Sequence, residues 1–143
     1  MSEADIHFEF YRHLQNSIDD EPKRGQITYS DVRSEYSKGI SGRADIVVFD
    51  ETEDPIFIIE AKRPEGGSKR DIDPYSRSVI QQAFGYAGGL GAPYFCTFNG
   101  DRLVVFNTYE EGVPLLERST KAYTISNLSE FADTLLDEIA NIS

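Results

Sequence analysis

Two strongly apolar segments, separated by a short polar stretch, constrain the fold more than any other feature of this sequence. Residues 43–50 (RADIVVFD) and 55–62 (PIFIIEAK) are rich in β-branched and aromatic residues. Strands that are apolar on both faces are typical of the centre of a sheet covered by helices on each side. The four residues between them, ETED, are polar, so we expect an antiparallel hairpin.

The rest of the chain alternates between helical and strand patterns. Apolar residues recur every four positions near the start, which predicts an amphipathic helix over residues 3–18. The other expected elements are strands over 26–36, 43–50, 55–62, 93–99 and 102–109, a helix over 75–90, and a final helix with Asn127 as its N-cap. The sequence therefore predicts one α/β domain over residues 1–143, with a mixed central sheet flanked by helices in the order α-β-β-β-α-β-β-α.

Composition excludes several classes of protein. The single cysteine, Cys96, cannot form an internal disulfide, and no apolar run approaches the roughly 20 residues of a membrane span. We therefore expect a cytoplasmic protein with no membrane partner. The net charge of −11 argues at first against nucleic acid, but residues 61–80 hold five basic and only three acidic residues.

Three charged residues interrupt the apolar hairpin. If the turn is centred between Thr52 and Glu53, Asp45 lies opposite Glu60, and Lys62 projects from the same face. Two carboxylates inside an apolar strand pair are destabilising unless they are neutralised, and Mg²⁺ or Mn²⁺ prefers such oxygen ligands. Two acids and a base on one face are the groups that metal-dependent phosphodiester hydrolysis requires. The competing interpretation is an ordinary solvated ion pair near the strand ends.

These residues carry a family resemblance. Asp45, the hairpin and the Glu60-Ala61-Lys62 triplet resemble the PD-(D/E)xK nuclease superfamily, which has a restriction-endonuclease-like core. With Gln82 and Tyr86 as a QxxxY element on the next helix, the chain most resembles the N-terminal nuclease domain of the type I restriction enzyme R (motor) subunit. The resemblance covers roughly residues 3–100. It implies a Mg²⁺-dependent (or Mn²⁺-dependent) DNA endonuclease that acts alone or with other restriction-complex subunits.

The resemblance also assigns roles to individual residues. Asp45 and Glu60 bind metal, with the Ala61 carbonyl completing the shell, and Lys62 is the catalytic base or electrostatic stabiliser. It also implies a metal-binding carboxylate on the first helix, for which we choose Glu9, with Glu3 as its competitor. Gln82 and Tyr86 would orient the substrate phosphate or the attacking water. Apart from the resemblance, the charges of Arg43 and Arg63 suit DNA contacts, with an exposed solubilising loop as the equal alternative for Arg63.

The sequence departs from the family in two respects. Ala44 stands where the superfamily name has proline, and the chain holds no GxxxxGK[ST] loop and is too short for a helicase motor. We therefore expect either an excised nuclease domain or a stand-alone relative. The alternative from another class is a non-catalytic acidic protein, either a degenerate nuclease fold or a DNA mimic. The intact set of Asp45, Glu60 and Lys62 favours the nuclease.

Overall fold

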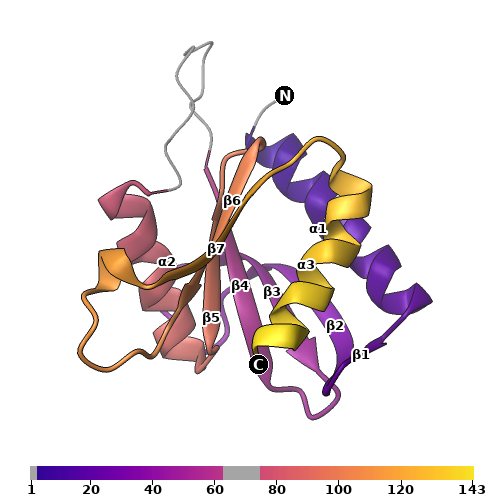
Figure 1. The fold of residues 1–143 in the computed structure, drawn as a ribbon, viewed down its shortest axis with the longest axis horizontal. Coiled ribbons are helices and arrows are strands. Elements are labelled where there is room, and N and C mark those ends of the chain that lie inside the picture. The colour runs from indigo at the N-terminus through magenta and orange to yellow at the C-terminus, as the bar shows by residue number, and fades with distance from the viewer. Residues whose placement is uncertain (1–2, 63–74) are drawn as a thin grey trace.

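A seven-stranded mixed sheet with helices on both faces forms the body of the protein (Figure 1). The computed structural model describes residues 3–62 and 75–143. The helices are α1 (Glu3–Asp20), α2 (Arg77–Leu90), the short 3-10 helix η1 (Leu115–Glu117) and α3 (Leu128–Ile142). The strands are β1 (Lys23–Arg24), β2 (Ile27–Tyr36), β3 (Ala44–Asp50), β4 (Pro55–Ala61), β5 (Tyr94–Phe98), β6 (Arg102–Asn107) and β7 (Ser119–Thr124).

The strands lie in the sheet in their order along the chain, from β1 to β7. Neighbouring strands are antiparallel except β4 and β5, which are parallel. The chain returns between these two strands through α2, as a parallel connection requires. The predicted mixed α/β fold is therefore confirmed, and the β3–β4 hairpin lies near its centre.

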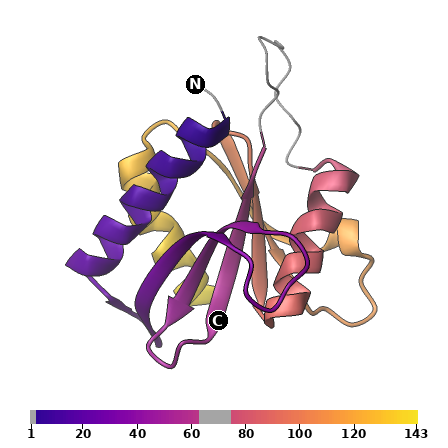
Figure 2. The same cartoon turned by 180° about the vertical axis from the view of Figure 1, so that it is seen from behind.

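Both faces of the sheet are covered, as the apolar strands predicted. Figure 1 and, from behind, Figure 2 show α1 and α3 together on one side and α2 on the other. Ile46 and Ile59 belong to the core under α1 and α3, whereas Val47 and Ile58 belong to the core under α2. Successive residues of β3 and β4 thus contribute to opposite cores, which explains why these strands lack the polar alternation of a half-exposed sheet.

The helix ends follow the expected capping chemistry. Asn127 accepts a 3.1 Å hydrogen bond from the main-chain N–H of Glu130 at the start of α3. At the end of α2, Gly91 has a φ of +78°, the left-handed conformation that glycine adopts without strain. The predicted N-cap and the glycine-rich helix end are therefore confirmed.

The sequence patterns missed three short elements. β1 and η1 hold only two and three residues, too few to show a periodic pattern. β7 is an edge strand that is exposed at all but one position, so its sequence STKAYT carries no apolar alternation. α1 also continues two residues beyond the predicted end at residue 18. The loop expected over residues 64–74 lies outside the described residues.

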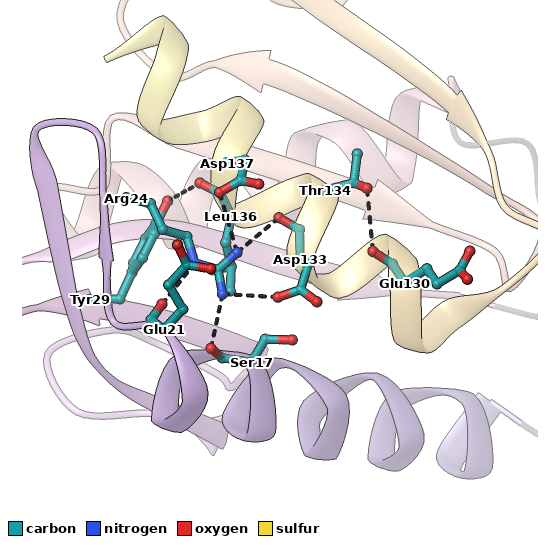
Figure 3. Close-up of polar contacts among 9 residues, drawn as sticks. All are labelled: Ser17, Glu21, Arg24, Tyr29, Glu130, Asp133, Thr134, Leu136 and Asp137. Carbon is teal, nitrogen blue, oxygen red and sulfur yellow. Dashed lines mark hydrogen bonds and ion pairs between the residues drawn. The ribbon is translucent and has the colours of Figure 1, made fainter.

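A buried arginine joins α1, β1 and α3 at the side of the sheet remote from α2 (Figure 3). Arg24 donates hydrogen bonds of 2.9 Å to the main-chain oxygens of Ser17 and Glu21 on one side. On the other side it contacts the carboxylates of Asp133 at 2.9 Å and Asp137 at 3.2 Å. Because the guanidinium group has several donors in a fixed plane, one side chain fixes both helices against β1.

None of the helices in the described part of the chain has both the length and the apolar character that a membrane span requires.

Candidate active site

The predicted register of the central hairpin is confirmed. Ile46 pairs with Ile59 and Val47 with Ile58, so the next position toward the strand ends sets Asp45 beside Glu60. The register shifts by one residue only near the turn, between Val48 and Phe49. Because the shift is confined to the turn, Asp45 and Glu60 at the other end of the hairpin keep the predicted alignment.

Two hydrogen bonds that cross between the strands hold the carboxylates of Asp45 and Glu60. The main-chain N–H of Asp45 donates to Oε1 of Glu60 over 3.1 Å. The main-chain N–H of Ala61 donates to Oδ2 of Asp45 over 2.8 Å. Hydrogen bonds from main-chain N–H groups stabilise the ionised form of a carboxylate, so the backbone holds both acids in place.

The carboxylate pair is largely removed from water. Glu60 is 1% exposed and Asp45 is half-buried. Burial raises the pKa of Asp45, and the negative charge of Glu35 raises it further. The hydrogen bond from the Ala61 N–H and the electrostatic interactions with His7 and Lys62 oppose this rise. A buried acid with a raised pKa beside a second acid is the electrostatic setting in which a bound cation is stabilised.

Lys62 lies directly after β4 and is held by the neighbouring strand. Its main-chain N–H donates a 2.8 Å hydrogen bond to the carbonyl oxygen of Phe98, which extends the β4–β5 ladder by one residue. Its positive charge lowers the pKa of Asp45, so the ammonium group acts on that carboxyl, and its catalytic role stays a prediction. The structure thus brings Asp45, Glu60, Ala61 and Lys62 together at one end of β3 and β4.

The metal-binding role expected of Glu9 on α1 stays a prediction. Among the side chains that the structure describes, no group of three His, Cys, Asp or Glu residues could hold a metal ion. His7 is the α1 residue whose charge acts on Asp45. Its Nε2 atom is buried and has no hydrogen-bond partner among the described residues. The side chain of Glu3, the competing choice, lies outside the described residues.

No motif in the sequence pointed to His7. A signal for His7 was nevertheless present, because it lies three residues before the buried Phe10 and seven before the buried Leu14. These positions share one face of a helix. The helix face that packs on the sheet therefore includes His7.

Gln82 and Tyr86 occupy one face of α2, as their spacing predicted. Nε2 of Gln82 donates a 3.1 Å hydrogen bond to the hydroxyl of Tyr86. Both line an open groove of about 440 Å³ between α2 and the β2–β3 connection, whose other lining residues are Gly39, Ile40, Ser41, Gln81, Gly85 and Gly89. This hydrogen bond joins the two side chains to each other, and their role toward the carboxylates stays a prediction.

The two expected DNA-contacting arginines have different outcomes. Arg43 immediately precedes β3, is 65% exposed and lies 3.7 Å from the carboxylate of Glu35. Its side chain is therefore open to solvent, and it lies two residues before Asp45 in the sequence. Arg63 lies outside the described residues.

Cys96 is buried and burial raises the pKa of its thiol, so this cysteine belongs to the core.

The fold and this cluster define a restriction-endonuclease-like nuclease domain. A solved structure with the same fold is described as that of the type IIG restriction endonuclease BpuSI, with a TM-score of 0.69 and 17% sequence identity. The match covers 95% of this chain but only 16% of that protein, so the chain corresponds to a small part of the larger enzyme.

Residues 8–112 match the family described as type I restriction enzyme R protein N terminus (HSDR_N), and the chain belongs to this family. No curated protein matches the sequence. The resemblance seen in the sequence is thus confirmed at the level of the family and the fold.

Proposed function

We propose that this domain is a divalent-metal-dependent DNA endonuclease, either the nuclease module of a type I restriction-like system or a stand-alone relative. The observation that carries the proposal is the carboxylate pair of Asp45 and Glu60, cross-linked by main-chain hydrogen bonds of 3.1 and 2.8 Å in an otherwise apolar hairpin, with the charge of Lys62 acting on it. Family membership supports DNA as the substrate.

The donor set fits Mg²⁺ or Mn²⁺. Carboxylate and main-chain carbonyl oxygens are the ligands that these hard cations prefer. Asp45, Glu60 and the carbonyl of Ala61 would hold the ion. A divalent cation there supplies positive charge that polarises the phosphodiester and makes water easier to deprotonate.

The remaining side chains have roles that follow from their charge and place. Lys62 lies beside the carboxylates, where as a neutral amine it would accept a proton from the attacking water, or as an ammonium group would offset negative charge developing on the phosphate. His7 opposes the effect of burial on Asp45, since its electrostatic interaction lowers the pKa of that carboxyl, whose pKa is nevertheless raised overall. Gln82 and Tyr86, already joined by a hydrogen bond, orient the phosphate or the water.

DNA binding by an acidic protein must be confined to one region. The net charge is −11, and residues 61–80 form the segment with more basic than acidic residues. Arg43 and Arg63 lie in sequence beside Asp45 and Lys62, and we assign them to phosphate contacts. The acidic exterior and the carboxylate pair repel DNA, so we expect weak binding without a divalent cation.

One observation favours a second function. The described side chains hold no group of three metal-ligating residues, which suits a non-catalytic acidic interaction protein, either a degenerate nuclease fold or a DNA mimic. Such a protein would bind no divalent cation at Asp45 and Glu60. Metal affinity therefore separates the two functions even when the isolated chain does not cut.

Nicking of supercoiled plasmid DNA with Mg²⁺ or Mn²⁺ tests the nuclease. We expect Asp45→Ala and Lys62→Ala to lose about 100-fold or more of the rate, the scale of a positioned acid–base group. Asp19→Ala and Lys121→Ala remove the same types of side chain from exposed positions and should leave the rate unchanged.

Calorimetric titration of the same variants with Mn²⁺ completes the test. Binding by the wild type that is lost in Asp45→Ala supports the metal site. Cleavage that is unaffected by both active-site substitutions, or an absence of both cleavage and Mn²⁺ binding, would contradict the proposal.

A further inference from the structure

Thr97 is a polar residue in the middle of the most completely buried part of the sheet. It lies in β5 between Cys96 and Phe98, and its side chain is fully buried. A hydroxyl group in such surroundings costs free energy unless it forms hydrogen bonds. A valine would fill the same volume without this cost, so the hydroxyl calls for a functional explanation.

The sheet register places Thr97 directly beside Glu60. The parallel pairing of β4 with β5 aligns Glu60 with Thr97 and Ile58 with Phe95. Ile58 and Phe95 both belong to the core under α2. Because residues two apart in a strand share a face, Glu60 and Thr97 also point to the α2 side of the sheet.

Glu60 is consequently flanked by polar groups from both neighbouring strands. On the β3 side its Oε1 accepts the 3.1 Å hydrogen bond from the N–H of Asp45. On the β5 side the adjacent position is Thr97. We propose that Thr97 is a positioning residue whose hydroxyl fixes the Glu60 carboxylate in the orientation that holds the divalent cation. This inference rests on the proposed function, since it assigns a role in that same metal site.

Burial alone does not single out Thr97, because Thr108 is also fully buried. Thr108 follows β6 at the opposite end of the β5–β6 hairpin, where its main-chain N–H donates to the carbonyl of Pro93. Its Oγ1 has no hydrogen-bond partner among the described residues. Thr108 is therefore a matched control: the same residue type, equally buried, and remote from Glu60 in the register.

The test compares Mn²⁺ affinity, measured by calorimetry on the full chain, in wild type, Thr97→Val, Thr97→Ser, Thr108→Val and Asp45→Asn. Loss of a group that orients a metal ligand weakens metal binding by about 10–100-fold, and we expect this for Thr97→Val. Thr97→Ser keeps the hydroxyl and should bind Mn²⁺ nearly as tightly as wild type. Thr108→Val should bind as wild type does. Tm measured without metal verifies that every variant is folded.

The outcomes separate this inference from the proposed function. If wild type binds Mn²⁺ and Asp45→Asn does not, but Thr97→Val binds as tightly as wild type, the role of Thr97 is overturned and the metal site stands. If Thr97→Ser binds as weakly as Thr97→Val, packing rather than the hydroxyl is responsible, which also overturns it. If wild type binds no Mn²⁺, or Asp45→Asn leaves binding unchanged, the metal site itself fails and the role of Thr97 fails with it.

Discussion

Gly42 lies against the ring of Tyr86, so closely that a Cβ atom at residue 42 would be 2.8 Å from the phenolic oxygen and 3.2 Å from the nearest ring carbon. Gly42 also has a φ of +94°, a conformation that other residues rarely adopt. This contact joins the QxxxY helix to the connection that leads into β3 and Asp45. The ring of Tyr86 thus has a structural partner in addition to its proposed role toward substrate.

Gly42→Ala should destabilise the fold more than Gly39→Ala does. Gly39 also has a positive φ, +85°, but a Cβ there would meet nothing within 4 Å. Both substitutions carry the backbone strain of roughly 1–2 kcal/mol, and only Gly42→Ala adds the clash with Tyr86. Urea unfolding gives the two free energies of unfolding.

The Tyr86→Phe background identifies the cause of the difference. Removing the phenolic oxygen takes away the closest of the contacts at Gly42, so the extra cost of Gly42→Ala should shrink there. Equal costs for the two glycine substitutions in the wild-type background would show that the connection moves freely away from α2.

Asp45→Asn should stabilise the metal-free protein near neutral pH. Burial raises the pKa of Asp45 in the folded state, so the folded protein binds this proton more tightly than the unfolded chain. The ionised carboxyl therefore reduces the free energy of unfolding as the pH rises above its ordinary pKa. We expect Asn to raise Tm by a few degrees at neutral pH, with a gain that disappears in acid, where the carboxyl is protonated in both states.

Asp50→Asn is the control of opposite sign. Burial alone would raise the pKa of Asp50, but the hydrogen bonds from Thr52 and from the main-chain N–H of Asp54 lower it overall. Its ionised form contributes stability that is present above the ordinary pKa and is lost as the pH falls through the folded-state pKa. This variant should lose stability at neutral pH. A Tm decrease for both variants would refute the electrostatic account of Asp45.

His7→Ala should weaken Mn²⁺ binding by about 10-fold, the lower end of the range for residues that support metal ligands. The electrostatic interaction of His7 with Asp45 lowers the pKa of that carboxyl, so protons compete more strongly with Mn²⁺ for Asp45 once the imidazole is removed. His13→Ala is the matched control on the same helix and should bind Mn²⁺ as wild type does. The same affinity in both variants would mean that α1 contributes nothing to the site.

The sequence determined the centre of the site because that centre is local. The four-residue turn sets the register of β3 on β4, so counting residues outward from the turn was enough to place Asp45 beside Glu60. The QxxxY pair was equally predictable, since Gln82 and Tyr86 lie one turn apart on one helix.

The parts that could not be predicted depend on contacts between distant segments. Thr97 lies beside Glu60 through a parallel pairing formed across α2, and no local pattern specifies that alignment. Which residues of α1 act on Asp45, as His7 does, depends on how α1 is rotated against the sheet. β7 is an exposed edge strand whose pairing with β6 leaves no apolar signature.

The contacts of Arg24 were likewise invisible in the sequence, and they lead to the last prediction. Arg24→Met should cost about 2–4 kcal/mol of unfolding free energy, because the main-chain oxygen of Glu21 loses this donor and that of Ser17 keeps only the N–H of Glu21. Arg33→Met is the control: its ion pair with Asp31 is equally short, at 2.7 Å, but Arg33 is 49% exposed.

An exposed ion pair contributes only about 0–1 kcal/mol, so Arg33→Met should be nearly neutral in urea unfolding. Arg24→Lys separates charge from geometry, since an ammonium group cannot reach both main-chain oxygens and both carboxylates at once. We expect it to recover only part of the loss. Full recovery by lysine would mean that the charge alone stabilises the junction of α1, β1 and α3, and that the planar hydrogen-bonding geometry of Arg24 contributes nothing.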